Sequence, residues 1–151
     1  MEKNNLNIIQ ILPMTVQDLS YLKNVLTIDF DDFWTYSILE QEFFNENTTY
    51  IIAKKDNEII GFAGILTIID EANIMNIVTK KNKRNLGIGS KLLSELINIS
   101  KSKNFKSITL EVNENNIPAV KLYEKFKFEK VGIRKKYYNN TDSAILMTLY
   151  L

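Results

Sequence analysis

The stretch KRNLGIGSKLL, residues 83–93, places two glycines one residue apart at the start of an apolar helical pattern. The chain has only 5 glycines in 151 residues, so two of them in one short stretch need an explanation. A strand-like segment, NIVT, and a basic segment, KKNKRN, precede the glycines, and a helix follows them. Glycines let the backbone approach a ligand closely, and the first N–H groups of a helix favour an anion. The stretch therefore predicts a phosphate-binding loop, with an ordinary helix start as the alternative.

Basic side chains surround this loop. They are Lys80, Lys81, Lys83, Arg84 and Lys91, and we expect all of them to add positive charge beside a bound phosphate group. The spacing does not match a dinucleotide fingerprint, which needs a third glycine, or a P-loop, which needs G-K-[ST]. The loop therefore belongs to some other class of phosphate site.

The segments on either side of the loop predict one α+β domain spanning residues 1–151. We expect strands over residues 6–12, 49–55, 59–69, 74–79, 106–112, 128–134 and 143–151. We expect helices from Val16 through Leu26, from Tyr36 to Phe44, from the glycines to about residue 101, and over residues 116–126. Thr15 and Asp18 resemble a capping box at the start of the first helix. The strands over 49–79 read as an antiparallel meander. Gly61 and Gly64 within it indicate a bulge or close packing rather than a binding site.

Composition limits the chemistry. The chain has no cysteine and no histidine, which excludes disulfides, thiolate or imidazole nucleophiles and His or Cys metal ligands. No acidic cluster has metal-binding spacing, so we expect no metal. Proton transfer in an enzyme of this composition must use Asp, Glu, Tyr, Lys, water or a terminus.

The charge balance also narrows the choice of partners. Formal net charge is +1, with 19 basic and 18 acidic residues, so we expect neither nucleic-acid binding nor attraction to an anionic membrane. No apolar run reaches the length of a membrane span, and the start MEKNNLNIIQ lacks the features of a signal peptide. We expect a cytoplasmic protein.

Two motifs resemble one known family. The pattern R-x-x-G-x-G, Arg84 to Gly89, resembles the coenzyme A pyrophosphate loop of the GCN5-related N-acetyltransferases (GNAT). The stretch LEVNENNIPAVKLYEKFKF, residues 110–128, resembles the second signature of that superfamily. Within it, NIVT, LEV, LYEKFKF and the ending IRKKYYNNTDSAILMTLYL look most like the ribosomal-protein-alanine N-acetyltransferase (RimI-type) branch.

The resemblance implies a mixed central β-sheet flanked by helices, with a splayed strand pair beside the glycine loop. It implies acetyl-CoA as co-substrate, held by main-chain groups of the strand before the loop and by the loop itself. The implied cofactor-binding residues are Ile77, Val78, Thr79, Arg84, Asn85, Leu86, Gly87, Ile88, Gly89, Ser90 and Asn116. The family often has a Pro after the strand and a Gln or Arg pair before the glycines, and the departures at Lys80, Lys81, Asn85 and Leu86 bear on affinity.

The resemblance also assigns roles to side chains. Glu111, in an otherwise apolar strand, becomes a catalytic base acting through water, whereas its residue pattern alone leaves a solvent-facing or ion-paired carboxylate equally open. Tyr123 becomes the general acid for the coenzyme A thiolate, with burial as a core ring as the alternative. Asn116 can cap the following helix or bind the cofactor, and we favour the cofactor. Three aromatic residues are candidates for binding the peptide substrate: Tyr137 and Tyr138, expected in the last hairpin loop, and Trp34 in DFDDFW.

The implied reaction is acetyl transfer from acetyl-CoA to a protein N-terminal α-amine, with the alanine of a small-subunit ribosomal protein as the expected acceptor. The amine attacks the thioester directly, because no cysteine is present to form an acyl-enzyme. Two alternatives stay open: a GNAT enzyme acting on a small-molecule amine or lysine, and a non-catalytic acyl-CoA-binding domain.

Overall fold

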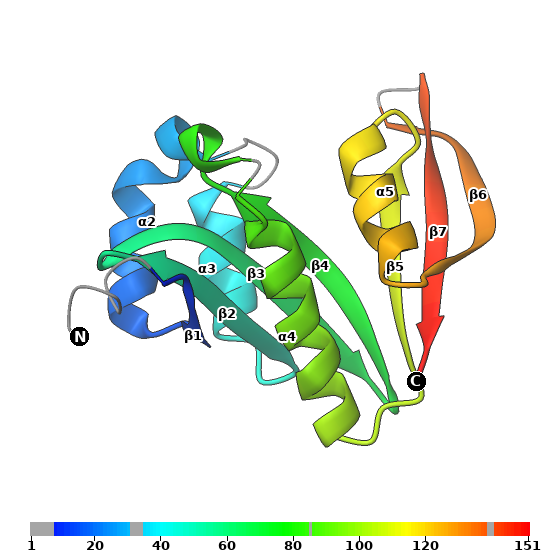
Figure 1. Ribbon diagram of the computed structural model, residues 1–151, viewed down its shortest axis with the longest axis horizontal. Helices are drawn as coiled ribbons and strands as arrows, with labels where there is room; N and C mark the ends of the chain where they lie inside the picture. Colours follow the sequence, from blue (N-terminus) through cyan, green and yellow to red (C-terminus); the bar gives the residue numbers. More distant parts are fainter. Residues whose placement is uncertain (1–7, 31–34, 85, 139–140) are drawn as a thin grey trace. The chain divides into compact units, whose positions relative to one another are not determined.

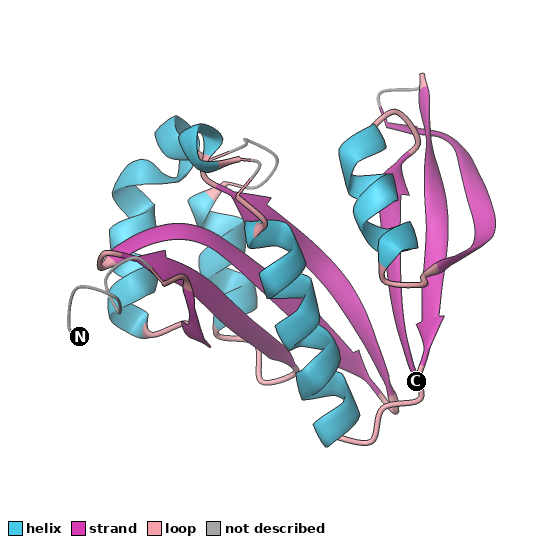
Figure 2. Ribbon diagram, viewed as in Figure 1, coloured by secondary structure: helices cyan, strands magenta, loops and turns pink. Residues whose placement is uncertain are grey.

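The computed structural model describes residues 8–30, 35–84, 86–138 and 141–151, without the side chains of 136–138. The helices are α2 (Val16–Asp29), α3 (Tyr36–Phe43), α4 (Ile88–Ser102) and α5 (Ile117–Lys125), with one 3₁₀ turn, η1 (Lys81–Lys83). The strands are β1 (Gln10–Pro13), β2 (Thr48–Lys55), β3 (Glu58–Ile68), β4 (Glu71–Thr79), β5 (Ser107–Asn113), β6 (Glu129–Tyr138) and β7 (Asp142–Tyr150). Figures 1 and 2 show these elements.

Strand order confirms the expected mixed α+β fold. In the described part of the chain the sheet runs β1-β2-β3-β4-β5-β7-β6. β1 and β2, β2 and β3, β5 and β7, and β6 and β7 pair antiparallel, and β4 pairs parallel with β5. The chain forms two compact units, Met1–Leu66 with Met75–Leu96 and Thr67–Ile74 with Ile97–Leu151, which are described in turn. None of the described helices is long and apolar enough to cross a membrane.

The first unit is built on the antiparallel strands β1, β2 and β3. Asp56 and Asn57 both have positive φ, 54° and 64°, and they form the two-residue turn that joins β2 to β3. Phe62 of β3 lies in a buried apolar cluster with Leu22 of α2 and Leu39 of α3. This cluster is the core on one face of the strands.

Glycines in β3 serve close packing, as the sequence predicts. A Cβ at Gly64 would lie 2.4 Å from the ring of Tyr50, the residue opposite it on β2. A Cβ at Gly61 would lie 2.9 Å from Cγ2 of Ile88, in the first turn of α4. The register of β2 and β3 also shifts beside Gly61, between Ala53 and Lys54, so the predicted bulge is present.

The second unit contains β5, β6 and β7, helix α5, and the start of β4. Glu71, Ala72 and Asn73 of β4 pair with Ser107, Ile108 and Thr109 of β5. Along β5 the buried side chains of Ile108, Leu110 and Val112 alternate with those of Thr109 and Glu111, so Glu111 lies on the opposite face from the apolar residues.

The predicted end of the strand after α5 is wrong. The sequence predicts that this strand ends at Arg134 and that a loop follows. β6 instead continues to Tyr138, which pairs with Asp142 of β7, after a register irregularity between Arg134 and Tyr138. A strand that keeps a hydrogen-bonded partner continues through polar and basic residues, because the partner strand satisfies its backbone groups.

Candidate active site

The glycine loop lies in the first unit, between the end of β4 at Thr79 and the start of α4 at Ile88. Gly87 has φ of +74° and no atom within 4 Å of where a Cβ would be, so a side chain there meets backbone strain rather than a clash. Its carbonyl accepts the first helical hydrogen bond from the Lys91 N–H, at 3.1 Å. Gly89 and Ser90 follow in the first turn, where N–H groups have no partner within the helix. This geometry suits an anion.

β3 holds both ends of the loop. At the start, the N–H of Lys80 donates to the carbonyl of Ile60 at 2.8 Å. At the end, Ile88 is buried, and the missing side chain of Gly61 lets Ile88 and Leu92 approach β3. A loop fixed at neighbouring positions of one strand presents its backbone in a defined conformation, which lowers the entropy lost when a ligand binds.

The charges of the loop differ from the prediction at Lys80. Its ammonium group forms a close ion pair with Glu58 and lies 4.0 Å from Asp29. The hydrogen bond to Glu58 raises the pKa of Lys80 and lowers the pKa of Glu58, so both stay charged. Glu58 and Asp29 offset part of the positive charge of Lys80, so it adds less positive potential at the loop than an unpaired lysine would. Lys81 and Arg84 are exposed, as expected for residues that attract an anion.

The strand before the loop presents its predicted cofactor residues through the backbone. Val78 is buried in the core with α2 and α3, while Ile77 and Thr79 are half-buried on the other side of β4. The Val78 side chain is therefore committed to the core, and only its main chain remains for a cofactor. Leu86 is exposed, and Asn85 lies outside the described residues.

The two predicted catalytic side chains lie in the second unit. The side chain of Glu111 is 29% exposed, and its Oε1 lies 2.8 Å from Nη2 of Arg134 on β6. The ion pair left open by the sequence is therefore present, and the role as a base stays a prediction. Tyr123 of α5 is buried with its ring edge-on to Phe128, at a centroid distance of 5.6 Å. Ring packing is thus confirmed, and the role as an acid stays a prediction.

Asn116 caps α5. Its side-chain oxygen accepts a hydrogen bond from the Ala119 N–H at 3.3 Å. The structure thus supports the capping role, and a contact with the cofactor stays a prediction. Tyr137 and Tyr138 end β6 instead of lying in the hairpin loop, and Trp34 lies outside the described residues.

Sequence reasoning missed two polar residues. Arg134 belongs to a strand whose neighbours the sequence does not reveal, so no local signal points to Glu111. Asn76 occupies an inward position of β4 between buried Ile74 and Val78, and its side-chain amide has no hydrogen-bond partner among the described residues. A polar residue at an apolar position of the alternating pattern could have singled out Asn76.

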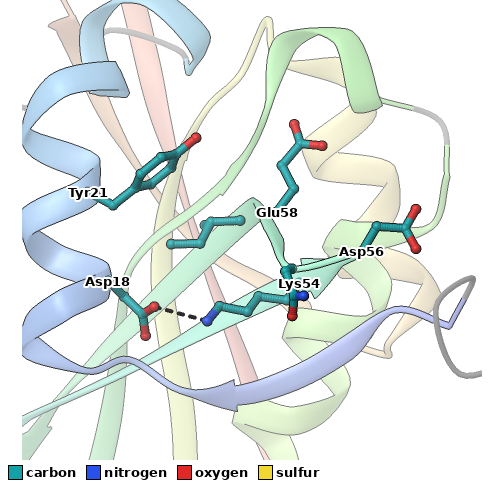
Figure 3. Close-up of a pocket in the computed structure, with 7 residues that line it drawn as sticks. Asp18, Tyr21, Lys54, Asp56 and Glu58 are labelled. Atoms are coloured by element: carbon teal, nitrogen blue, oxygen red, sulfur yellow. Dashed lines mark ion pairs between the residues drawn. The ribbon is translucent and has the colours of Figure 1, made fainter.

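A cavity of about 370 Å³ lies elsewhere in the first unit, at the turn between β2 and β3 beside α2. Figure 3 shows its lining, with Lys54 reaching Asp18 at 3.2 Å. No predicted site residue lines it. Within the described ranges, no three His, Cys, Asp or Glu side chains form a group that could hold a metal ion.

Comparison with known proteins decides the family. The model of the acetyltransferase (GNAT) family matches residues 16–128, more than half of the chain. The chain belongs to the GNAT family. This GNAT protein is therefore an acyltransferase, as the two motifs predict.

Relatives of this GNAT protein point to one branch. A protein of Haemophilus influenzae named "[Ribosomal protein bS18]-alanine N-acetyltransferase" is 37% identical over 124 residues, 78% of this chain and 82% of its own. The crystal structure of the ribosomal-protein-S18-alanine N-acetyltransferase from Escherichia coli matches with a TM-score of 0.86 and 24% identity, over 95% of this chain and 94% of that one. A GNAT acetyltransferase from Elizabethkingia anophelis with acetyl-CoA bound matches with a TM-score of 0.77 and 25% identity, over 95% of this chain and 98% of that one. The predicted fold and branch are confirmed.

Proposed function

We propose that this protein transfers the acetyl group of acetyl-CoA to the N-terminal alanine of a small-subunit ribosomal protein related to bS18. The observation that carries the proposal is the relative from Haemophilus influenzae. Its name states this reaction, and its sequence aligns with 78% of this chain at 37% identity. The signature loop supports it, because Gly87 and the first turn of α4 present backbone N–H groups suited to a pyrophosphate.

In this proposal acetyl-CoA is the co-substrate. The main chain of Ile77, Val78 and Thr79 pairs with the pantetheine arm in the manner of an added strand, and the loop holds the pyrophosphate. The half-buried state of Ile77 and Thr79 is compatible with a backbone that accepts such a partner. The relative from Elizabethkingia anophelis, which has acetyl-CoA bound, supports the choice of co-substrate.

The reaction is a direct transfer. The neutral α-amine attacks the thioester carbonyl, the new C–N bond forms, and the C–S bond breaks to release the coenzyme A thiolate. Glu111 accepts the proton lost by the amine through a water molecule, and Tyr123 donates a proton to the departing sulfur. No covalent enzyme intermediate is needed.

An α-amine suits this machinery better than lysine. The unperturbed pKa is about 7.7–8.0 for an α-amine and about 10.4 for lysine. Neutralising the amine at pH 7 therefore costs about 1.2 kcal/mol for the first and about 4.6 kcal/mol for the second. A single carboxylate base, in a chain without histidine, favours the more easily neutralised amine.

A peptide panel tests the substrate. Acetyl-CoA is offered with a peptide beginning Ala-Arg, with its N-terminally blocked twin carrying an internal lysine, and with spermidine. We expect rapid transfer only to the free alanine terminus, measured as release of the coenzyme A thiol and as added mass on the peptide. Equal rates on the blocked peptide would assign the protein to lysine acetylation, and a preference for spermidine would assign it to small amines.

A further inference from the structure

Glu111 is not an isolated carboxylate. The guanidinium of Arg134 lies 2.8 Å from its Oε1, close enough for a charge-assisted hydrogen bond. This bond restricts the directions that the carboxylate can take. A carboxylate has two oxygens and about four acceptor sites, so one that accepts this bond can still accept a proton.

The strand register explains how these residues meet. Glu111 of β5 stands opposite Leu146 of β7, and Arg134 of β6 stands opposite Ala144 of the same strand. Leu146 and Ala144 are two residues apart, so all four side chains lie on one face of the sheet. Ala144 is fully buried and has only a methyl group, which leaves room for the Arg134 side chain to cross β7.

Other charged groups on this face lie at its ends. In the described part of the second unit, Asp142 at the start of β7 accepts a hydrogen bond from the amide of Asn113 at 3.1 Å. Glu129 at the start of β6 stands opposite Thr148. Arg134 is therefore the described cation that directly contacts Glu111.

We propose that Arg134 is the positioning residue of Glu111, orienting its carboxylate toward the attacking amine and disfavouring the ammonium form of that amine by its positive charge. The inference rests on the proposed function, because it assumes that Glu111 is the base. A cation close to an amine favours the deprotonated state of that amine. Loss of Arg134 should therefore move deprotonation of the bound amine to higher pH.

The ion pair between Arg134 and Glu111 contributes little to the stability of the fold. The side chains of Arg134 and Glu111 are 52% and 29% exposed, and ion pairs with this much access to water contribute little to folding. We therefore expect Arg134→Gln and Arg134→Lys to fold and to melt near the wild-type temperature. A loss of activity in Arg134→Gln can then be assigned to the reaction.

The kinetic test uses the full-length protein, acetyl-CoA and the Ala-Arg peptide between about pH 6 and pH 9. In Arg134→Gln we expect kcat at pH 7 to fall on the order of tenfold, with the KM for acetyl-CoA unchanged and the acidic limb of the kcat profile moved to higher pH. Arg134→Lys keeps a cation and should recover most of the rate. In a Glu111→Gln background, Arg134→Gln should lower kcat by less than it does in wild type, because the positioning of Glu111 is already lost and only the effect of the charge on the amine remains.

Lys130→Gln is the matched control. Lys130 is on the same strand but stands opposite Met147, which pairs with the inward-facing Leu110, so its side chain lies on the other face. Its loss removes the same charge without touching Glu111, and we expect an unchanged profile. An equal shift in Lys130→Gln, or full additivity of Arg134→Gln with Glu111→Gln, overturns the inference.

A second measurement separates the inference from the proposed substrate. The side-chain carboxyl carbon of Glu111, followed by NMR at pH 7, should change its chemical shift in Arg134→Gln, which loses the ion pair, and keep it in Lys130→Gln. This change without acetylation of any peptide would mean that the pairing stands and the proposed substrate is wrong. Active wild-type enzyme with an identical Glu111 signal and identical kinetics in Arg134→Gln would mean that the inference is wrong.

Discussion

Gly87 and Gly89 meet different physical requirements, although they stand one residue apart. Gly87 has φ of +74°, a conformation that costs a side-chain-bearing residue about 1–2 kcal/mol. Gly89 lies within α4, where any residue can adopt the backbone. The backbone of Gly89 therefore does not require a glycine, and under the proposed function the missing side chain lets the ligand approach closely.

Gly89→Val tests that role. We expect acetyl-CoA affinity to fall by about tenfold or more, because a branched side chain blocks approach to the first-turn N–H groups. Stability should be retained, since valine forms helix better than glycine. Isothermal titration calorimetry beside thermal melting measures both quantities.

Ser94→Val controls for a valine introduced into the same helix. Ser94 is exposed in α4 and lies one and a half turns beyond Gly89. Affinity should be unchanged in this variant. Wild-type affinity in a folded Gly89→Val protein would contradict the assignment of the loop to the cofactor.

At the scale of elements, the start of α2 shows how one predicted motif connects two elements. The capping box is present: the Thr15 N–H donates to Asp18 at 2.9 Å, and the Asp18 N–H donates to the Thr15 hydroxyl at 3.1 Å. Lys54 of β2 lies 3.2 Å from the other oxygen of Asp18. Asp18 therefore caps the helix and also links α2 to the sheet.

The pH dependence of folding stability should reflect the ionisation of the Asp18 carboxyl. Burial raises the pKa of its carboxyl, but the bonds from Thr15 and Lys54 outweigh burial, and the net pKa is lowered. A lowered folded-state pKa contributes stability above the unfolded value of about 3.9, which is lost as pH falls through the folded value. Asp18→Asn should cost about 1–2 kcal/mol at pH 7, in the range of a helix cap. The difference from wild type should shrink below about pH 4.

Urea unfolding at pH 7, pH 4 and pH 3 measures this difference. Glu46→Gln is the control, because Glu46 is exposed and its loss should leave stability unchanged at each pH. A constant difference between Asp18→Asn and wild type across this range would show that the charge of Asp18 contributes nothing to stability.

At the scale of the whole molecule, the two compact units do not meet at a linker. Their division falls between Leu66 and Thr67 within β3, between Ile74 and Met75 within β4, and between Leu96 and Ile97 within α4. Domain boundaries normally fall in exposed, flexible segments instead. The prediction of one domain over residues 1–151 is therefore best tested by cooperativity.

We expect one thermal transition in differential scanning calorimetry, with equal calorimetric and van't Hoff enthalpies, because one helix and two strands that both units share should couple their unfolding. Saturating acetyl-CoA should raise the midpoint temperature of the whole transition, by an amount that grows with the logarithm of the acetyl-CoA concentration. Two resolved transitions, with only one of them moved by acetyl-CoA, would show that the units unfold separately.

Local patterns in the sequence determined most of the elements and the family. The capping box before α2, the alternation along β5 and the glycines before α4 each act within a few residues, so they can be recognised without knowing the fold. Roles implied by the signatures, such as base and acid for Glu111 and Tyr123, came from resemblance and stay predictions.

Only the tertiary structure decided which charges meet. Glu111 and Arg134 come together because β7 pairs with β5 on one side and β6 on the other, in a register that places Leu146 and Ala144 between them. Lys80 is likewise paired with Glu58 because β3 brings the two residues together. A strand pattern shows which residues share a face but not which strand lies beside it, since pairing depends on contacts between residues far apart in the chain.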